Sequence, residues 1–184
     1  MLHRIFIPGS FSPFHDGHYK MIENFLFNDN AEIIIIMSEK KRDDIDNSVI
    51  TDLLNKIFSK YDNVKIIKSD ISPIKWIYEN TIEDENVIYS MIRSNKNADD
   101  RICEAYANSF SVNGKFHSDK IFVEKINLKI EPLKFNNGEF ISGTILRDSA
   151  KNKNFNKFRE GYEYMLMNNI LSLDDVNNVY RTIF

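Results

Sequence analysis

Residues 8–18 read Pro-Gly-Ser-Phe-Ser-Pro-Phe-His-Asp-Gly-His, and this stretch decides the fold. A short apolar run, residues 5–7, comes immediately before it, and apolar side chains at helical spacing follow it from Tyr19 to Leu26. The predicted order is therefore a strand, a loop rich in Gly, Ser and Pro, and a helix. In an α/β protein, backbone N–H groups and the positive end of a helix meet a phosphate at such a turn.

The residue types of this turn suit a phosphate. Gly9 and Gly17 let a ligand press against the backbone, because neither carries a side chain. His15 and His18 are three residues apart, so both rings can face one point if the helix begins near residue 16. Two imidazoles can donate hydrogen bonds to a phosphate without the strong hydration of a lysine.

The same two histidines admit two other interpretations. They could be exposed loop side chains, or they could bind zinc, since His-x-x-His is a spacing found in zinc sites. A zinc site would need one or two more Cys or His ligands. Only His3, His117 and Cys103 remain in the chain, and none has a supporting spacing. A phosphate role is the favoured interpretation.

Apolar runs predict further strands at residues 33–37, 64–67 and 87–92, with one or two more at 122–123 and 128–130. Helical patterns lie between them, and this alternation predicts a parallel sheet with right-handed crossovers. We predict an α/β fold with a Rossmann-like, doubly wound parallel sheet of order 3-2-1-4-5, followed by C-terminal helices. The run at 33–37 lacks alternation and is rich in isoleucine, which indicates burial on both faces.

Ligands of such a sheet gather beyond the carboxyl ends of its strands. Four loops are expected there, at residues 8–18, 38–44, 93–100 and 136–144. The last of these leads into a second motif, residues 141–147, which reads Ile-Ser-Gly-Thr-Ile-Leu-Arg.

The second motif predicts a helix N-terminus with a cationic clamp. Ser142 is a good cap, Gly143 lets a ligand approach the backbone, and Thr144 adds a hydroxyl. Arg147 lies one turn later on about the same face, where it suits triphosphate oxygens. Alone, the motif could equally be a capped surface helix with a solvated arginine. Its pairing with the first motif favours a ligand.

Composition sets wider bounds. The chain has 184 residues, 42% of them hydrophobic, and a net charge of −3, so bulk charge does not argue for a nucleic-acid or membrane partner. Its single Cys103 excludes an internal disulfide and suits a reducing cytosol, which predicts a cytoplasmic protein. No apolar run approaches a membrane span, and the first residues lack a secretory signal.

We expect two parts in the chain. Residues 1–150 would form the α/β domain, and residues 151–184 a C-terminal helical extension packed on the same domain. That extension could instead close over the site or pack against another subunit in a homo-oligomer.

Both motifs resemble signatures of the HxGH nucleotidyltransferase superfamily. The first is similar to Gly-Thr/Ser-Phe-Asp-Pro-Phe-His-x-Gly-His, with Ser12 where Asp is commoner, and the second to Ile-Ser-x-Thr-x-x-Arg. Members transfer a nucleotidyl group from ATP or CTP to a phosphate or similar acceptor and release pyrophosphate. The resemblance covers about residues 5–147, with the specific motifs at its two ends.

The resemblance implies roles for three groups of residues. The catalytic residues would be His15, His18 and Arg147. The nucleotide-binding residues would be Gly9, Ser10, Phe11, Gly17, Ser142, Gly143 and Thr144. The acceptor-binding residues would be Lys41, Arg42 and Arg93, although a charge run such as residues 40–42 is as often a solvated loop.

The implied partners are a nucleoside triphosphate with Mg²⁺ and a phosphorylated small-molecule acceptor. Arg147 at the end of the second motif is more typical of adenylyltransferases, so ATP is preferred over CTP. The alternative is a cytidylyltransferase that uses CTP and a phospho-alcohol or sugar phosphate. A second alternative is a regulatory module that binds nucleotide and has lost catalysis.

Overall fold

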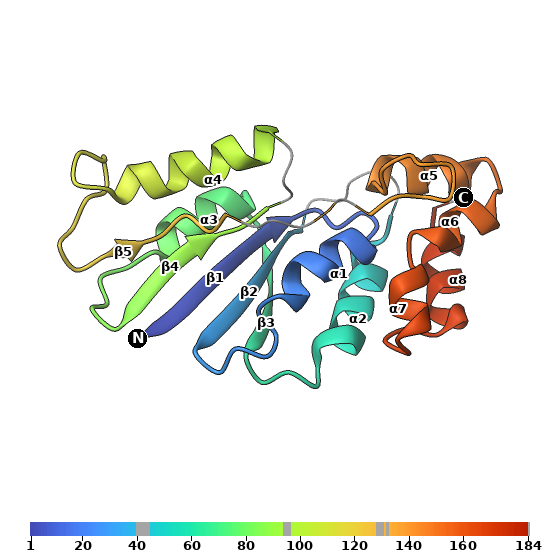
Figure 1. The fold of residues 1–184 in the computed structure, drawn as a ribbon, viewed down its shortest axis with the longest axis horizontal. Helices are drawn as coiled ribbons and strands as arrows, with labels where there is room; N and C mark the ends of the chain where they lie inside the picture. Colours follow the sequence, from blue (N-terminus) through green and yellow to red (C-terminus); the bar gives the residue numbers. More distant parts are fainter. Residues whose placement is uncertain (40–44, 94–96, 128–130, 132, 184) are drawn as a thin grey trace. The chain divides into compact units, whose positions relative to one another are not determined.

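Five parallel strands pair in the order β3-β2-β1-β4-β5 in the computed structural model of the chain, which confirms the predicted sheet (Figure 1). The structure describes residues 1–39, 45–93, 97–127, 131 and 133–183. The strands are β1 (Leu2–Gly9), β2 (Ala31–Ser38), β3 (Val64–Ser69), β4 (Val87–Met91) and β5 (Phe122–Val123). The further strand predicted at 128–130 lies outside the described residues.

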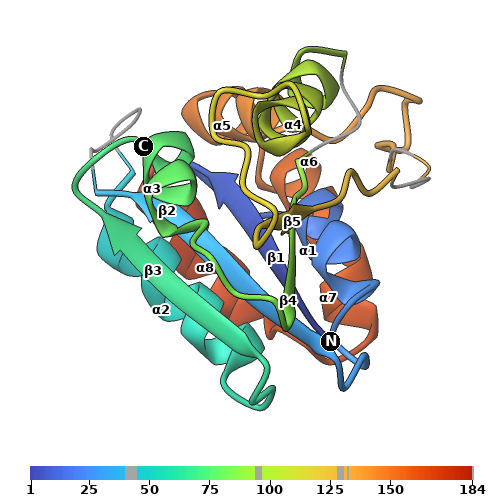
Figure 2. The ribbon, with the colours of Figure 1, turned by 90° about the vertical axis from the view of Figure 1, so that its left-hand side faces the viewer.

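Strand β1 is the central strand, because it pairs with β2 on one side and β4 on the other (Figure 2). Ile5 stands opposite Ile33 in β2 and opposite Ser90 in β4. Residues 33–37 of β2 are all buried, as their unbroken apolar run predicted. The motif that follows β1 therefore leaves the middle of the sheet at its carboxyl edge.

A helix follows each of the first four strands. These helices are α1 (Asp16–Glu23), α2 (Asn47–Phe58), α3 (Pro73–Asn80) and α4 (Asn97–Phe110). Pro73 occupies the first turn of α3, where its missing N–H costs no hydrogen bond. At the start of α2, the carboxylate of Asp46 accepts a hydrogen bond from the N–H of Ser48 and caps the helix.

The chain divides into two compact units. The first unit consists of Met1–Gly9, Met21–Glu39 and Tyr61–Ile130, and it holds the whole sheet with α3 and α4. The second unit consists of Ser10–Lys20, Lys40–Lys60 and Glu131–Phe184. It holds the first motif from Ser10 onward, helix α2 and the described helices that follow the sheet.

The core of the first unit is aromatic. The ring of Phe6 in β1 stacks on Tyr89 in β4, with centroids 5.9 Å apart, and meets the edge of Trp76 in α3 at 6.1 Å. Helix α3 packs against β1 and β2, and α4 packs against β4 and β5. Cys103 on α4 belongs to this buried cluster. Burial raises the pKa of its thiol to about 11.

The second unit is helical. Its C-terminal helices are α5 (Gly143–Lys151), α6 (Phe155–Glu160), α7 (Glu163–Met167) and α8 (Leu173–Arg181). Helix α6 packs on both α5 and α8, and α8 also packs on α2. The fully buried ring of Phe158 lies 5.3 Å from Tyr162 and 5.2 Å from Tyr180. Within the ranges that the structure describes, no helix is both long enough and apolar enough to cross a bilayer.

Candidate active site

The first motif begins at the end of β1, and its residues from Ser10 onward lie in the second unit and lead directly into α1. That helix begins at Asp16, which meets the condition for the two histidine rings to face one point, and the carbonyl of His15 accepts hydrogen bonds from the N–H groups of His18 (2.9 Å) and Tyr19 (3.1 Å). Phe11 has a φ of 48°, in the left-handed region that bulky residues rarely occupy. Such a conformation costs roughly 1–3 kcal/mol and is found most often at functional sites.

The two histidines of the motif stack on each other. Their ring centroids are 3.9 Å apart, with 29° between the planes. Two full positive charges at about 4 Å would repel by about 4 kcal/mol at an effective dielectric of 20. An anion bound beside the two rings would relieve such a repulsion.

The backbone of Gly17 selects the tautomer of His15. The Gly17 N–H donates a hydrogen bond to His15 Nδ1 at 3.1 Å, so that nitrogen carries a lone pair. In the neutral ring the proton then resides on Nε2, which becomes a donor. A side chain at position 17 would crowd this arrangement, since its Cβ would lie 3.0 Å from His15 Cε1 and 3.2 Å from Nδ1.

Aromatic side chains hold the His18 ring in place. Phe11 meets it edge-on at 5.2 Å, and Phe14 stacks on it at 5.6 Å. Phe14 in turn contacts Phe58 of α2 at 6.0 Å. Because these neighbours are buried and rigid, the imidazole has few alternative orientations.

The second motif adjoins the first. Ser142 caps α5 as predicted, with its Oγ accepting from the N–H of Ile145 at 3.4 Å. Arg147 Nη1 donates a hydrogen bond to the backbone carbonyl of Ser12, and Nη2 donates to Thr144 Oγ1 at 3.3 Å. A Cβ at Gly143 would lie 3.0 Å from the same Ser12 carbonyl oxygen. The histidine loop and the start of α5 are therefore in direct contact.

The family model described as "Cytidylyltransferase-like" matches residues 6–149. This range includes the whole of both motifs, residues 8–18 and residues 141–147. The chain belongs to the cytidylyltransferase-like family. This confirms the predicted membership of the HxGH nucleotidyltransferase superfamily. No curated protein matches the chain.

Asp16, between the two histidines of this cytidylyltransferase-like chain, is a candidate site residue that the sequence did not predict. Its carboxylate accepts hydrogen bonds from the N–H groups of Tyr164 (2.7 Å) and Met165 (3.1 Å), and its own N–H donates to the carbonyl of Gly161 (2.9 Å). Burial raises the pKa of Asp16 to about 7, against the opposing effect of these two backbone donors. An acidic residue in a first helical turn ordinarily complements the helix dipole, and no local pattern points to partners 148 and 149 residues away.

The remaining predicted residues of the family site are distributed as follows. Gly9 ends β1 in the first unit, opposite Met37. The carbonyl of Ser10 accepts a hydrogen bond from Ser12 Oγ at 3.1 Å, so the serine that stands where aspartate is commoner ties the loop to itself. Arg93 belongs to the first unit, where it forms an ion pair with Asp99 at 3.0 Å.

Two predicted acceptor-binding residues, Lys41 and Arg42, lie outside the described residues. Among the side chains that the structure does describe, there is no group of three or more His, Cys, Asp or Glu residues that could hold a metal ion. The zinc interpretation of the histidine pair therefore gains no additional ligands from the described residues.

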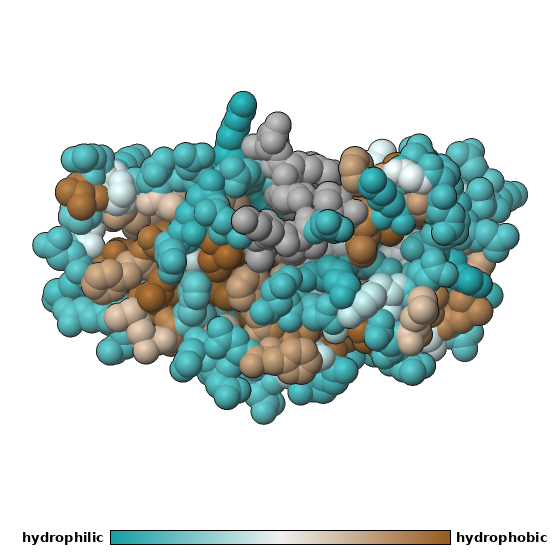
Figure 3. Space-filling view, in the orientation of Figure 1, coloured by the Kyte–Doolittle hydropathy of each residue, from teal (hydrophilic) through white to brown (hydrophobic). Residues whose placement is uncertain are grey.

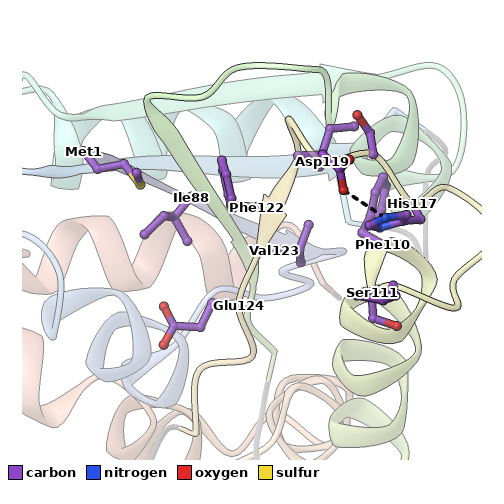
Figure 4. Close-up of a pocket in the computed structure, with 12 residues that line it drawn as sticks. Met1, Ile88, Phe110, Ser111, His117, Asp119, Phe122, Val123 and Glu124 are labelled. Carbon is purple, nitrogen blue, oxygen red and sulfur yellow. Dashed lines mark ion pairs between the residues drawn. The ribbon is translucent and has the colours of Figure 1, made fainter.

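A cavity of ≈ 420 Å³ lies in the first unit, between the end of α4 and strand β5 (Figure 4). Apolar side chains gather on part of the surface in Figure 3. Phe122 and Val112, which line the cavity, are both exposed large apolar side chains. His117 and Asp119 form an ion pair at its rim, with 3.3 Å between Nε2 and Oδ1. None of its lining residues belongs to either motif of the family, so it is not the candidate active site.

Proposed function

We propose that this protein transfers a nucleotidyl group, AMP from ATP in the first instance, to a phosphorylated small-molecule acceptor and releases pyrophosphate. The observation that supports this most is the hydrogen bond from Arg147 to the carbonyl of Ser12. It joins the loop of the stacked histidines to the N-terminus of α5 within one unit of the chain. A triphosphate bound at that junction would meet imidazole donors at one end and a guanidinium at the other.

The proposed reaction is a direct in-line transfer. An oxygen of the acceptor phosphate forms a bond to the α-phosphorus, and the bond from that phosphorus to the bridging oxygen breaks. Pyrophosphate leaves with the electron pair. Positioning and charge stabilisation supply most of the catalysis in such a transfer, and no covalent enzyme intermediate is needed.

The histidines would act as hydrogen-bond donors in this reaction. His18 would donate to the α-phosphate oxygens as negative charge builds on them. His15, whose Nδ1 is occupied by the Gly17 N–H, would donate through Nε2 to the bridging or β-phosphate region. Ser10 would present its hydroxyl or N–H to the acceptor or to the α-phosphate.

The second motif would hold the leaving group. Ser142, Thr144 and Arg147 would bind the β- and γ-phosphates, since a helix N-terminus and a guanidinium both favour phosphate oxygens. The guanidinium already has its donors directed at Ser12 and Thr144, which fixes it at the junction before a ligand arrives. Arg93, with Lys41 or Arg42, would bind the acceptor phosphate.

Magnesium fits this proposal as a companion of the triphosphate. No cluster of protein ligands is present among the described residues, so phosphate oxygens and water would hold the ion. When bound, Mg²⁺ supplies charge neutralisation to the triphosphate.

The choice of nucleotide rests on one residue and one family description. Arg147 favours ATP, by resemblance to adenylyltransferases. The cytidylyltransferase-like family description keeps CTP, with a phospho-alcohol or sugar phosphate as acceptor, as the second candidate.

Pyrophosphate release tests the proposal. The purified protein is incubated with Mg²⁺ and either ATP or CTP across a panel of phosphorylated acceptors. We expect release with ATP and at least one acceptor, and Arg147→Lys to lower it by about tenfold because lysine cannot form the forked contact. Arg181→Lys in α8 is the matched control and should retain full activity.

The outcome also separates the alternatives. Release with CTP alone would move the assignment to the cytidylyltransferase. A thermal shift with a triphosphate but no release with any acceptor would instead support a regulatory module that binds nucleotide. Absence of both binding and release would overturn the proposal.

A further inference from the structure

The junction between α6 and α7, residues 161–165, contacts both motifs of the candidate site. Gly161 is the C-cap of α6, and its carbonyl accepts a hydrogen bond from the N–H of Asp16 in the first motif. On its other side it presses on α5 beside Arg147, since a Cβ at position 161 would lie 2.6 Å from Leu146 Cδ2. One turn of chain therefore touches the histidine loop and the arginine helix together.

Asp16 fastens the first motif to this junction through its side chain. Its two carboxylate oxygens accept from the N–H groups of Tyr164 and Met165, which lie in the first turn of α7. A helix has no partners of its own for these N–H groups, so Asp16 caps α7 from a remote part of the chain. The contact is almost closed to solvent, with Asp16 only 2% exposed.

Side chains of α1 strengthen the same attachment. The ring of Tyr19 lies 6.1 Å from that of Tyr164, and the ammonium group of Lys20 lies 3.4 Å above the Tyr164 ring. Residues 16, 19 and 20 surround His18 in the sequence, so the helical turn that carries His18 is held along its length. Since the imidazoles of His15 and His18 stack, a shift of this turn would move both rings.

We propose that Asp16 is a positioning residue for the histidine pair and that the junction at residues 161–165, beyond the family match at 6–149, is a working part of the transfer site. This inference rests on the proposed function. The carboxylate touches no reacting atom in it. Instead, it sets the orientation of the His15 and His18 donors relative to the start of α5, and misplacing such donors by about 1 Å can cost about 100-fold in rate.

Three variants test this role. Asp16→Ala removes both acceptors, whereas Asp16→Asn keeps one carboxamide oxygen of similar shape. Asp175→Asn is the matched control, because Asp175 also caps a C-terminal helix, α8, but contacts Ser172 and Lys56 rather than a histidine. We expect Asp16→Ala to lower kcat by roughly 10–100-fold with a change in KM for the triphosphate of less than about threefold. Asp16→Asn should recover much of that loss, and Asp175→Asn should keep the wild-type kcat.

The imidazole NMR signals provide a readout that does not need turnover. The chain has four histidines, and His3 and His117 belong to the first unit, where they serve as internal references. Asp16→Ala should shift the signals of His15 and His18 and leave those of His3 and His117 in place. If Asp16→Ala does not fold, the same comparison is made with Asp16→Asn, where a shift confined to His15 and His18 supports the role.

Two results would overturn the inference. One is a folded Asp16→Ala with unchanged kcat and unmoved His15 and His18 signals. The other is a loss of kcat that Asp175→Asn reproduces at equal thermal stability, which would indicate a general effect of weakened helices. If the wild-type protein releases no pyrophosphate at all, the proposed function fails, and the NMR comparison still decides whether Asp16 orients the rings.

Discussion

The two units of the molecule are built in different ways. In the first unit, strands that alternate with helices along the chain pair into a sheet, and the core cluster is formed by apolar side chains at regular spacing. In the second unit, helices from distant segments pack together, and individual hydrogen bonds between side chains and backbone attach the candidate site: the N–H of Tyr164 donates to Asp16, and Arg147 donates to the carbonyl of Ser12. The first unit forms the sheet, and the second unit contains the candidate catalytic residues His15, His18 and Arg147.

This difference teaches where substitutions should act. Hydrophobic burial in the first unit is spread over many residues, so one polar change there alters stability and leaves function alone. The hydrogen bonds that attach the candidate site in the second unit are few and directional, so the loss of one should alter activity more than it alters the fold.

The largest expected effect is the difference in activity between alanine variants at His18 and at His117. His18→Ala removes a proposed transition-state donor and should lower kcat/KM by two to three powers of ten, or about 3–4 kcal/mol, with little change in melting temperature. His117→Ala, in the first unit, should leave activity unchanged. Steady-state pyrophosphate release and thermal melting measure both. A His18→Ala variant with wild-type activity would contradict the proposal that the second unit contains the catalytic residues.

The next effect concerns the stability of the second unit against pH. Burial raises the pKa of Asp16 to about 7, with Glu163 acting in the same direction and Lys20 opposing it. The folded state then binds a proton more readily than the unfolded chain, so wild-type stability falls as pH rises from about 4 to about 7. Asp16→Asn lacks this dependence, and its unfolding free energy relative to wild type should rise by about 3 kcal/mol over that range. Urea denaturation at a series of pH values measures it.

Asp175 is the control, because its carboxyl should make stability depend on pH in the opposite direction. Burial acts against ionisation there too, but hydrogen bonds from Lys56 and Ser172 outweigh it and lower the pKa of the carboxyl. Its contribution is present above the unfolded pKa and is lost as pH falls. Relative to wild type, Asp175→Asn should therefore gain stability on acidification, whereas Asp16→Asn should lose it. Equal slopes for the two variants would contradict the assigned environment of Asp16.

A smaller effect is expected at Gly161. A methyl group there would collide with Leu146, which is fully buried and cannot swing away, and overpacking of this kind costs about 1–3 kcal/mol. Leu146→Val should recover part of the loss when combined with Gly161→Ala, because it removes a carbon from the crowded site. A double-mutant cycle of unfolding free energies measures the coupling. Additive losses would show that the two residues do not press on each other.

The smallest effect compares buried tyrosines. Tyr106 shares a hydrogen bond of 2.8 Å with Thr81, whereas the hydroxyl of Tyr89 is buried without a hydrogen-bond partner among the described residues. Tyr106→Phe should cost about 1 kcal/mol, and Tyr89→Phe should be neutral or stabilising. Both lie in the first unit, so neither should change pyrophosphate release. Chemical denaturation provides the two free energies, and a larger loss for Tyr89→Phe would contradict the hydrogen-bond pattern.

The sheet could be predicted because its signals are local. Residues 33–37 form an unbroken apolar run, and a run of that kind is itself the evidence for a strand buried on both faces. The cap at Ser142 could be predicted in the same way, since the serine bonds a backbone N–H three residues away. For the site, the residue types of both motifs were enough to predict that they bind phosphate groups.

The attachments of the site could not be predicted, for a physical reason. Asp16 finds its partners 148 and 149 residues away, and a carboxylate that accepts from backbone N–H groups leaves no side-chain pattern at the other end. The contact of Arg147 with the Ser12 carbonyl is of the same kind. The spacing of side chains predicts whether a segment is a helix or a strand. It does not predict which backbone atoms of a distant segment a side chain will contact.

The lone thiol of the chain offers a practical consequence. Cys103 is buried in the core of the first unit, and burial raises its pKa to about 11, so thiolate is scarce at neutral pH. An alkylating reagent should therefore modify it only when α4 and the sheet separate. The rate at which Cys103 is alkylated therefore reports the opening of the first unit without an added label. Variants of the second unit can be compared with the wild-type protein by this rate.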